Sequence, residues 1–497
     1  MRRLHISGYV KISKILVLLG LPLFCLGLSL FLSAITETET RSGSLGKLAY
    51  IQGNNPHSGN LWVKDLLTGQ TTRLTTDGYS SQPRWSPSGK WLAFQSKEQI
   101  GLIEVDSHHT YSLTTEHEAE TFAWSPKQDQ LAYVTNGHLE VIFAGDEVPV
   151  TLVEPEQPSM PDLGQVKGSR IVWNPDASWI AYVWQERQSP NLPVFQEIWK
   201  VSLDGKEKLK LYPNQQAEEG EIILDSWSYD GRLLFFWQSE VRSQSVLADG
   251  VPLYALSIDN NPIVGLATSV LVYQDFVEPA PTTDQVAVIV GEGRLIQTNK
   301  TLHLVLLTTK MSETLTSPEL AIASLAWSPN GEHIVYTAMP DRGQQGGGKD
   351  DPYALTQRKI WLITLRDQET HQLTNKSGYS DNYPVWSNDS SNLIFPRINE
   401  GGIVSLWIVS IADKAPRQLV NKLFVIPSGW HGYYGYIQWD NYFDWWTATA
   451  LEQNNSLSKL RIIVDQRIIY FTIILCILVL LSFVGIMMRK KVTRDEA

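Results

Sequence analysis

Few residues in this sequence are arranged in a way that would support catalysis or metal binding. The ten histidines are scattered over 497 residues, and His108 and His109 form the only adjacent pair. Adjacent residues of a strand point to opposite faces, so this pair does not favour a shared metal site. Acidic residues such as Asp176, Asp230 and Asp389 follow a turn pattern and are better explained by turn formation. With no serine-hydrolase elbow, zinc-protease helix, phosphate loop or C-x-x-C motif, the sequence predicts no catalytic residue, metal or cofactor.

Six tryptophans have a spacing that suggests structure rather than chemistry. They occur in near-copies of one phrase, which is clearest at 85–89 (Trp-Ser-Pro-Ser-Gly) and at 327–331 (Trp-Ser-Pro-Asn-Gly). The six positions are Trp85, Trp124, Trp173, Trp227, Trp327 and Trp386. A sugar-stacking site would not recur in every copy. We therefore interpret these indoles as packing contacts between repeated units.

The copies lie about 40 to 60 residues apart, which is typical of a repeated supersecondary unit. Each tryptophan is expected to end a strand before a type I turn, in which proline presets φ and glycine closes the turn. An apolar strand follows, then a strand with an aromatic residue, then a fourth strand that often ends Leu-Thr. Four strands per unit, arranged radially, predict an all-β propeller. The spacing between Trp227 and Trp327 is about twice the others, and a degenerate copy of the phrase lies between them at 278–281.

The number of blades follows from where the array begins. The array begins at 47–51 with a sequence typical of the second strand of a blade. Counted from there, the chain contains eight sets of three strands. The missing innermost strand is expected after Lys422, where 424–430 resembles the repeat faintly. Pairing that strand with the first set would close the ring. Eight blades are favoured, and seven remain the alternative.

The combination of Trp-Ser-Pro-x-Gly turn, apolar strand and Leu-Thr ending resembles the TolB-type β-propellers. It is also similar to the propeller of the dipeptidyl peptidase IV family. The resemblance covers roughly residues 47–440 and implies the fold; it implies little about function, because such propellers serve as adaptors, inhibitors and enzyme lids. A peptidase of that family would also need a hydrolase domain, and only the 27 residues 441–467 separate residue 440 from the second apolar segment described next.

Two apolar segments, 15–35 and 468–488, carry no charged residue. At 1.5 Å rise per residue, each reaches about 30 Å as a helix, which is the thickness of the bilayer core. Basic residues precede the first segment and follow the second, so both chain ends are expected in the cytoplasm and the propeller outside it. A cleaved signal peptide is the alternative for the first segment.

The charge of the chain agrees with that location. Its formal net charge is −11, and the ends outside the two apolar segments contribute +6, so the part between them carries about −17. An acidic domain of this kind is not expected to bind nucleic acid. The only cysteines, Cys25 and Cys476, lie within the two apolar segments. We therefore predict an integral protein of the plasma (inner) membrane.

The expected organisation has seven parts. They are a cytoplasmic tail (1–14), a membrane span (15–35), a linker (36–46), the propeller (47–440), an aromatic juxtamembrane linker (441–467), a second span (468–488) and a cytoplasmic tail (489–497). Nine aromatic residues crowd 430–446. Three roles stay open for them: a structural clasp, a collar at the membrane interface, or a recognition surface. The residues assigned to a recognition surface are Trp430, Tyr433, Tyr434, Trp439, Trp445 and Trp446.

The function favoured by the sequence is a membrane-anchored propeller that binds an extracytoplasmic protein or an envelope component as a scaffold. A hydrolase with its site in the central funnel is the alternative, because propeller enzymes gather catalytic groups from several blades. A sensor that relays binding inward is a third class. Convergence of carboxylates or histidines at one mouth of the channel would favour the enzyme.

Overall fold

The computed structural model describes residues 45–448, apart from 98, 114–118, 157–163, 169, 187–193, 214–219, 242, 260–261, 344–354 and 431. Leu45–Thr447 form one compact unit. Within the described part, no helix is long and apolar enough to cross a membrane. The two predicted spans, 15–35 and 468–488, lie outside the described residues, as do both predicted tails.

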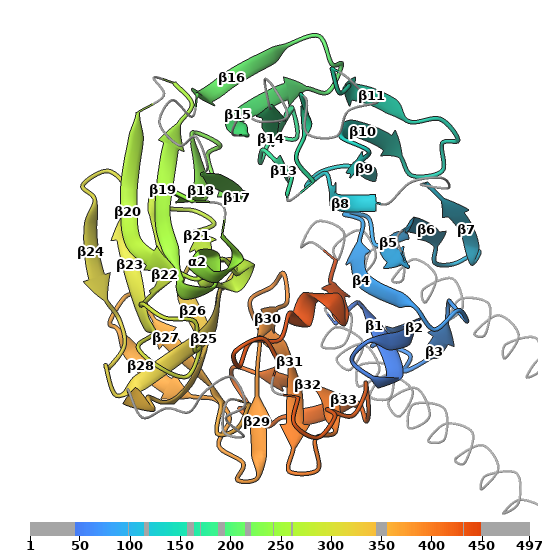
Figure 1. Ribbon diagram of the computed structural model, residues 1–497. Helices are drawn as coiled ribbons and strands as arrows, with labels where there is room; N and C mark the ends of the chain where they lie inside the picture. Colours follow the sequence, from blue (N-terminus) through green and yellow to red (C-terminus); the bar gives the residue numbers. More distant parts are fainter. Residues whose placement is uncertain are drawn as a thin grey trace, which may run out of the picture. The chain divides into compact units, whose positions relative to one another are not determined.

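Eight antiparallel sheets surround a central channel, which confirms the eight-bladed propeller (Figure 1). Blade 1 contains β34 (Phe443–Trp446), β1 (Lys47–Asn55), β2 (Ser58–Asp65) and β3 (Thr71–Arg73), and blade 2 contains β4 (Ser80–Trp85), β5 (Trp91–Ser96), β6 (Gln99–Glu104) and β7 (His109–Ser112). Blade 3 contains β8 (Ala119–Trp124), β9 (Gln130–Thr135), β10 (His138–Phe143) and β11 (Val150–Val153). Blade 4 contains β12 (Gln165–Val166), β13 (Val172–Trp173), β14 (Trp179–Glu186), β15 (Phe195–Ser202) and β16 (Lys208–Pro213).

The second half of the ring repeats this plan. Blade 5 contains β17 (Glu221–Trp227), β18 (Leu233–Ser239), β19 (Val251–Ser257) and β20 (Ile263–Val270), and blade 6 contains β21 (Val277–Pro279), β22 (Gln285–Val290), β23 (Thr301–Leu306) and β24 (Met311–Thr314). Blade 7 contains β25 (Leu320–Trp327), β26 (His333–Pro340), β27 (Lys359–Thr364) and β28 (Glu369–Gln372). Blade 8 contains β29 (Tyr379–Asp381), β30 (Val385–Trp386), β31 (Asn392–Asn399), β32 (Val404–Ser410) and β33 (Arg417–Val420). The short helices are α2 (Gln244–Asp249), η1 (Gln274–Phe276) and η3 (Trp439–Asn441).

The Leu-Thr endings seen in the sequence have a local structural cause. The hydroxyl of Thr374 accepts the backbone N–H of Ile360, the first apolar residue of β27, at 3.0 Å. Thr75 and Thr316 make the same bond to Leu61 and Leu302, at 2.8 and 3.0 Å. A threonine after β3, β24 or β28 therefore satisfies a buried donor of the neighbouring strand.

The ring closes as expected in principle but at a different segment. The innermost strand of blade 1 is β34, not 424–430, so the propeller continues past residue 440 into the segment assigned to the juxtamembrane linker. Trp445 lies opposite Leu48 in β1, just as Trp85 lies opposite Leu92 in β5. This register explains why β34, and not the earlier segment, completes the blade. The 424–430 segment instead runs along the edges of blades 8 and 1.

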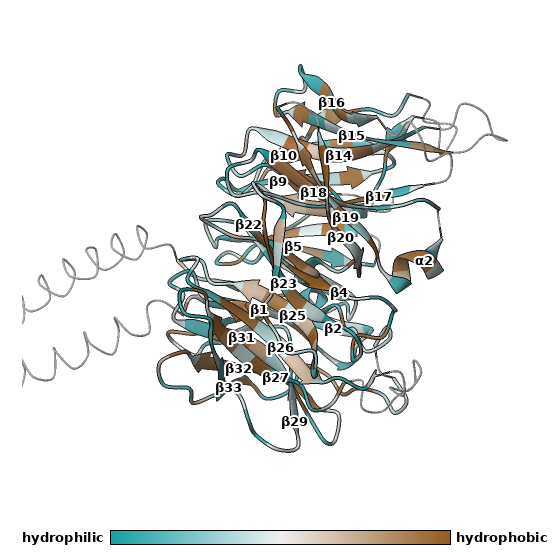
Figure 2. Ribbon diagram, turned by 90° about the vertical axis from the view of Figure 1, so that its left-hand side faces the viewer, coloured by the Kyte–Doolittle hydropathy of each residue, from teal (hydrophilic) through white to brown (hydrophobic). Residues whose placement is uncertain are grey.

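The two faces of the propeller differ. One carries the Trp-Ser-Pro-x-Gly turns, and we call it the turn face; the other carries the β1–β2 hairpin and α2. Figure 2 shows α2 projecting from this second face. Both ends of the propeller lie at the turn face, because Lys47 at the start of β1 pairs with Trp446 at the end of β34.

Candidate functional site

Each of the six repeated tryptophans connects its own blade to the preceding blade. The indole N–H of Trp124 donates to the backbone carbonyl of Arg84, the residue that precedes Trp85, at 2.9 Å. The other five do the same at 3.0 to 3.2 Å, from Trp173 to Ala123, Trp227 to Val172, Trp327 to Glu278, Trp386 to Ala326 and Trp85 to Asp444. Most of these indoles are buried between blades. Their hydrogen-bonding group is therefore used within the fold.

A seventh tryptophan occupies the same register and was missed in the sequence. Trp445 follows Asp444 in β34 as Trp85 follows Arg84, but no Ser-Pro turn comes after it. It lies about 60 residues after Trp386, which fits the repeat spacing. That spacing was the signal available for finding it.

We call residues 427–442 the strap. They cross the middle of the face opposite the turns, and we call this face the strap face. In Figure 1 this orange-to-red segment reaches into the centre of the ring. On the far side it meets blade 6, where Ile296 N–H donates to the carbonyl of Tyr434 at 3.2 Å. The ring of Tyr436 stacks on Tyr273, with centroids 3.6 Å apart. The strap thus covers part of the channel mouth.

Charged groups fix the strap on both sides of the channel. The Arg84 guanidinium of blade 2 bonds both the carboxylate and the backbone carbonyl of Asp440, each at 2.5 Å. Buried Arg358, which precedes β27 of blade 7, donates to the carbonyl of Gly435 at 2.5 Å. These bonds involve charged groups at low exposure, where they are stronger than neutral ones.

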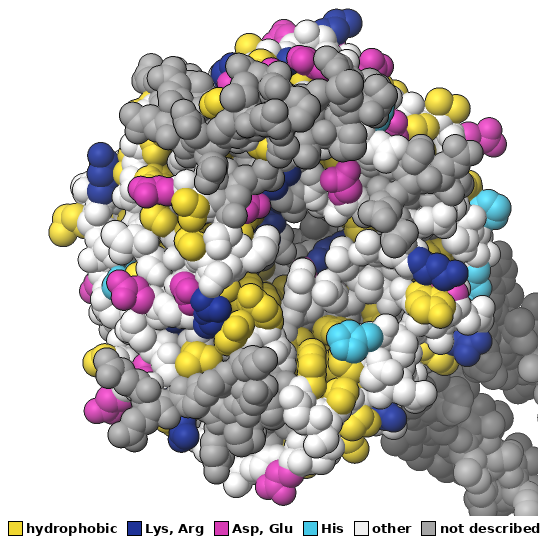
Figure 3. All heavy atoms as spheres, viewed as in Figure 1, with side chains coloured by type: hydrophobic (Ala, Val, Ile, Leu, Met, Phe, Trp, Pro, Cys, Tyr) yellow, Lys and Arg dark blue, Asp and Glu magenta, His cyan; other side chains and the backbone are white. Residues whose placement is uncertain are grey.

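Beside the strap lies a cavity of about 690 Å³, which we call the strap cavity. Aromatic rings line it from the β1–β2 hairpin, from the residues just before β4 and η1, from the β29–β30 connection of blade 8, and from the strap and the segment before it. They are His57, Tyr79, Tyr273, Tyr383, Phe424, Trp430, Tyr433, Tyr436 and Tyr442. Tyr79 and Tyr433 are 56% and 53% exposed. Figure 3 shows a hollow near the centre of this face, with basic and hydrophobic side chains around it. The cavity is thus rich in aromatic rings and polar at its base.

A second cavity of about 720 Å³ lies toward the turn face, and we call it the tryptophan cavity. Four of the repeated indoles line it: Trp85, Trp124, Trp173 and Trp227. Four residues line both cavities: Arg170, Gln274, Gln438 and Asp440. We call these four residues the waist, because they are where the two cavities adjoin.

Buried carboxyl groups surround the waist, and burial raises their pKa values. Desolvation raises the pKa of Asp275 to about 7, although the hydroxyl of Tyr436 donates to its carboxylate at 2.9 Å. Burial also raises the pKa of Asp225 to about 6 and that of Glu278 to about 8. Glu278 accepts the backbone N–H of Trp327 at 2.7 Å. Burial thus brings the pKa values of these three carboxyl groups, which lie behind the cavity lining, close to neutral pH.

The structure divides the six residues predicted as a recognition surface. Trp439 and Trp445 are buried in the core shared by blades 8 and 1. Trp446 donates its indole N–H to the carbonyl of Pro87 at 2.9 Å. Gly89, with φ of 67°, lies so close to this indole that a side chain there would collide with it. These three residues therefore lie within the fold, which matches the structural clasp, one of the three roles left open for this segment.

The other three, Trp430, Tyr433 and Tyr434, remain together on the strap. Trp430 and Tyr433 line the strap cavity, and Tyr433 and Tyr434 contact edge to face at 4.9 Å. Arg294 of blade 6 lies over the Tyr434 ring, 5.2 Å from its centroid. Of the six residues predicted as a recognition surface, Trp430 and Tyr433 are therefore the two that line the strap cavity.

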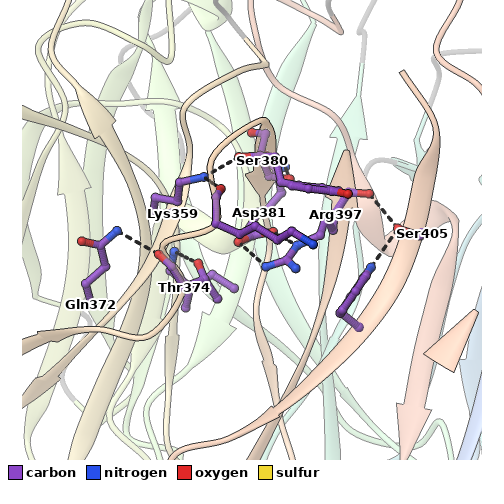
Figure 4. Close-up of polar contacts among 12 residues, drawn as sticks. Lys359, Gln372, Thr374, Ser380, Asp381, Arg397 and Ser405 are labelled. Carbon is purple, nitrogen blue, oxygen red and sulfur yellow. Dashed lines mark hydrogen bonds and ion pairs between the residues drawn. The ribbon is translucent and has the colours of Figure 1, made fainter. Parts of the chain in front are cut away.

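A separate polar cluster lies where blades 7 and 8 meet (Figure 4). Arg397 and Asp381 form a buried two-pronged ion pair with N–O distances of 2.5 and 2.9 Å. The Arg397 guanidinium also lies 4.5 Å from the centroid of Trp407. Both charges are fully paired, so we assign this cluster to packing of the two blades. Among the described residues, no group of three His, Cys, Asp or Glu side chains is arranged to hold a metal ion.

Comparisons with known proteins identify the fold but no family. No family model matches the chain, and no curated protein matches it in sequence. Among solved structures, dipeptidyl peptidase 4 of Porphyromonas gingivalis is 10% identical with a TM-score of 0.53, covering 78% of this chain and 61% of that one. Dihydro-heme d1 dehydrogenase NirN is 13% identical with a TM-score of 0.52, covering 76% and 74%. TolB of Acinetobacter baumannii is 14% identical with a TM-score of 0.33, covering 66% and 63%. At these identities the similarity establishes a β-propeller fold alone.

Proposed function

We propose that this chain is a membrane-anchored, extracytoplasmic β-propeller that binds a protein or another component of the cell envelope and acts as a scaffold. The observation that carries the proposal is the strap cavity. It combines nine aromatic rings with polar groups at its base and opens on the face opposite both ends of the propeller.

The composition of the cavity mouth supports a binding role. Tyr79, Trp430 and Tyr433 approach it from the start of β4 and from the strap, and the first and last are more than half exposed. Tyrosine and tryptophan give a large contact area at a low cost in conformational entropy, and both are enriched in protein recognition surfaces. The strap holds Trp430 and Tyr433 in place through contacts to blades 2, 6 and 7, so part of the binding surface is preorganised.

Membrane anchoring rests on the sequence. The apolar segments 15–35 and 468–488 and their basic flanks support a location of the propeller outside the cytoplasm. Both connections from the propeller toward these segments leave from the turn face. The strap cavity thus lies on the face opposite both attachment points of the propeller.

Photocrosslinking in intact membranes tests the proposal. A photoreactive amino acid replaces Tyr433 in the strap, and a matched variant carries it at Tyr229, an exposed tyrosine of the turn face. We expect a reproducible crosslinked partner from position 433 and none from position 229. Equal patterns from both positions, or no partner at 433, would contradict a protein-binding role for the strap cavity. Labelling of a cysteine at position 433 by an impermeant reagent on whole cells tests the location.

A hydrolase is the second candidate, because Asp225, Asp275 and Glu278 surround the waist and burial raises the pKa of each. A carboxyl that holds its proton near neutral pH is suited to general acid catalysis. Turnover of an ester, lactone or glycan by the purified full chain would support this candidate if the Glu278→Gln variant lost it. Turnover that survives in both Glu278→Gln and Asp275→Asn would exclude these groups.

A further inference from the structure

Two glutamine side chains at the waist have hydrogen-bonding groups that the fold does not use. Gln274 begins η1 and Gln438 precedes η3, and both side chains are exposed although they lie inside the channel. Neither amide bonds to a described residue, and Gln438 makes no side-chain cap on η3. A primary amide both donates and accepts hydrogen bonds. The waist therefore offers neutral donors and acceptors to whatever occupies the two cavities.

The charges beside these amides are largely neutralised by one another. Asp440 is bonded to Arg84, and one nitrogen of Arg170 bonds the Asp225 carboxylate at 3.3 Å and the Leu224 carbonyl at 3.0 Å. An anionic ligand would meet the carboxylates of Asp440 and Asp225 as well as the two arginines. A strongly charged ligand would have to break these ion pairs, which is costly at low exposure. The waist is thus suited to an uncharged ligand.

The aromatic groups above and below the waist offer ring surfaces. In the tryptophan cavity, the indole N–H groups of Trp85, Trp124 and Trp173 already donate to backbone carbonyls of neighbouring blades. What these residues leave to a ligand is the part of each ring that lines the cavity, which is largest for Trp124, the one indole of the set that is not buried. Such ring surfaces attract weakly positive C–H groups. Aromatic rings line the strap cavity in the same way. A ligand made only of apolar groups would leave the waist amides buried and unpaired, at a cost in free energy.

We propose that the strap cavity, the waist and the tryptophan cavity form one site for an uncharged oligosaccharide. Sugar rings present C–H faces to the aromatic walls, and their hydroxyls pair with the amides of Gln274 and Gln438. Each cavity has the size of a small-ligand pocket, and the two adjoin, which suits a chain of sugars rather than a single ring. The inference rests on the proposed binding function and names the ligand class.

Titration of the full-length protein with uncharged tetrasaccharides tests the inference. The protein is kept in lipid nanodiscs, because many detergents carry sugar headgroups. The probes are cellotetraose, maltotetraose and chitotetraose, with tetragalacturonate as the anionic comparison and an uncharged unstructured peptide as the polypeptide comparison. Calorimetry and tryptophan fluorescence are the readouts. We expect saturable binding of at least one uncharged tetrasaccharide, with a fluorescence change from the indoles of the tryptophan cavity.

Two variants and a matched control locate the site. Gln274→Ala and Gln438→Ala each remove one free amide, and each is expected to weaken saccharide binding between about twofold and tenfold. Gln70→Ala removes an exposed glutamine in the β2–β3 turn and is expected to leave binding unchanged. Because the two waist amides bond no described residue, the melting temperature of all three variants should match that of the parent.

Three outcomes overturn the inference: no saturable binding of any uncharged tetrasaccharide, unchanged affinity in both waist variants, or tighter binding of the anion or the peptide. These results are separable from the crosslinking test. A partner captured at position 433 without saccharide binding removes this inference and leaves the proposed protein-binding function. Saccharide binding that both waist variants weaken, without a captured protein, keeps the site and removes the protein partner.

Discussion

The internal junctions of the ring and the seam between blades 8 and 1 join neighbouring blades in different ways. At the junction of blades 7 and 8, the indole N–H of Trp386 donates to Ala326 of blade 7 at 3.1 Å. At the seam, the corresponding Trp445 donates instead to Leu45, just before β1 of its own blade, at 2.6 Å. The repeated contact is therefore absent at the point where the two ends of the array meet.

Other hydrogen bonds join the two blades at the seam. Asn388 of blade 8 bonds the hydroxyl and the carbonyl of Thr447 through its backbone and side chain, at 2.9 and 2.5 Å. Gly53 N–H donates to the carbonyl of Leu423 at 2.9 Å, so the segment before the strap also joins blade 1 to blade 8. Six of the seven internal junctions thus use the repeated tryptophan, whereas closure uses the residues after the array. The same closing segment builds the strap cavity.

The largest effect that would sharpen this comparison comes from the two equivalent tryptophans. Trp386 and Trp445 are similarly buried, at 8% and 7% exposure. Replacing either with alanine should lower the free energy of unfolding by about 3–5 kcal/mol. Because β34 is the strand that completes blade 1 from the end of the array, Trp445→Ala should open blade 1 locally. Hydrogen exchange should then show loss of protection in β1–β3 before the other blades.

Two comparisons check that result. Trp386→Ala, at an internal junction, should not give early exchange in blade 1. Trp445→Phe keeps an aromatic ring but loses the bond to Leu45, and should cost about 1 kcal/mol. Uniform loss of protection in both alanine variants would contradict a seam that opens separately.

The second effect concerns the pH dependence of stability and the contact between Tyr436 of the strap and Asp275 beside blade 6. Burial raises the pKa of Asp275 to about 7 in the folded protein, well above the usual value near ~4. Between these values the folded state binds a proton that the unfolded state has released, so stability rises as pH falls through this window. Asp275→Asn removes the ionisation and can still accept the Tyr436 hydroxyl. At pH 8 the variant should be more stable by about 2–4 kcal/mol.

Denaturant unfolding between pH 5 and 8 measures the difference. The pH dependence should flatten in Asp275→Asn, while Asp146→Asn, at an exposed loop position, should leave it unchanged. Greater loss of stability in Asp275→Asn as pH rises would mean that the charged carboxylate stabilises the strap.

The fold could be predicted because its determinants are local. The Trp-Ser-Pro-x-Gly phrase, the apolar strand and the Leu-Thr ending each lie within a few residues, and bonds such as Thr374 to Ile360 act within one blade. The closing strand was misplaced because Trp445 lacks the Ser-Pro turn that marked the other copies. In the other blades the turn leads from the innermost strand into the next strand of the same sheet. β34 instead pairs with β1, which comes from the start of the array, so the turn is not needed.

The site could not be predicted in the same way, because its contacts join distant parts of the chain. Tyr436 and Asp275 are 161 positions apart, and Arg84 and Asp440 are 356 apart. The aromatic crowding at 430–446 correctly marked an unusual segment. Within this segment some aromatic side chains lie in the core, such as Trp439, and others line the cavity, such as Tyr433. Which of the two applies depends on how the strap crosses the channel, and no local sequence pattern encodes that path.

The smallest effect tests whether polar contacts at the seam contribute as much as those inside the array. Asn388→Ala removes the side-chain bond to Thr447 but keeps the backbone bond, and should cost about 1 kcal/mol. Thr447→Val removes the hydroxyl that accepts the backbone N–H and should cost a similar amount. The equivalent internal contact joins Asn330 N–H to the Ser390 hydroxyl at 3.1 Å, so Ser390→Ala is the matched variant. If Ser390→Ala costs as much as Thr447→Val, closure relies on the same turn contacts as the internal junctions, and the difference between them is confined to the tryptophan.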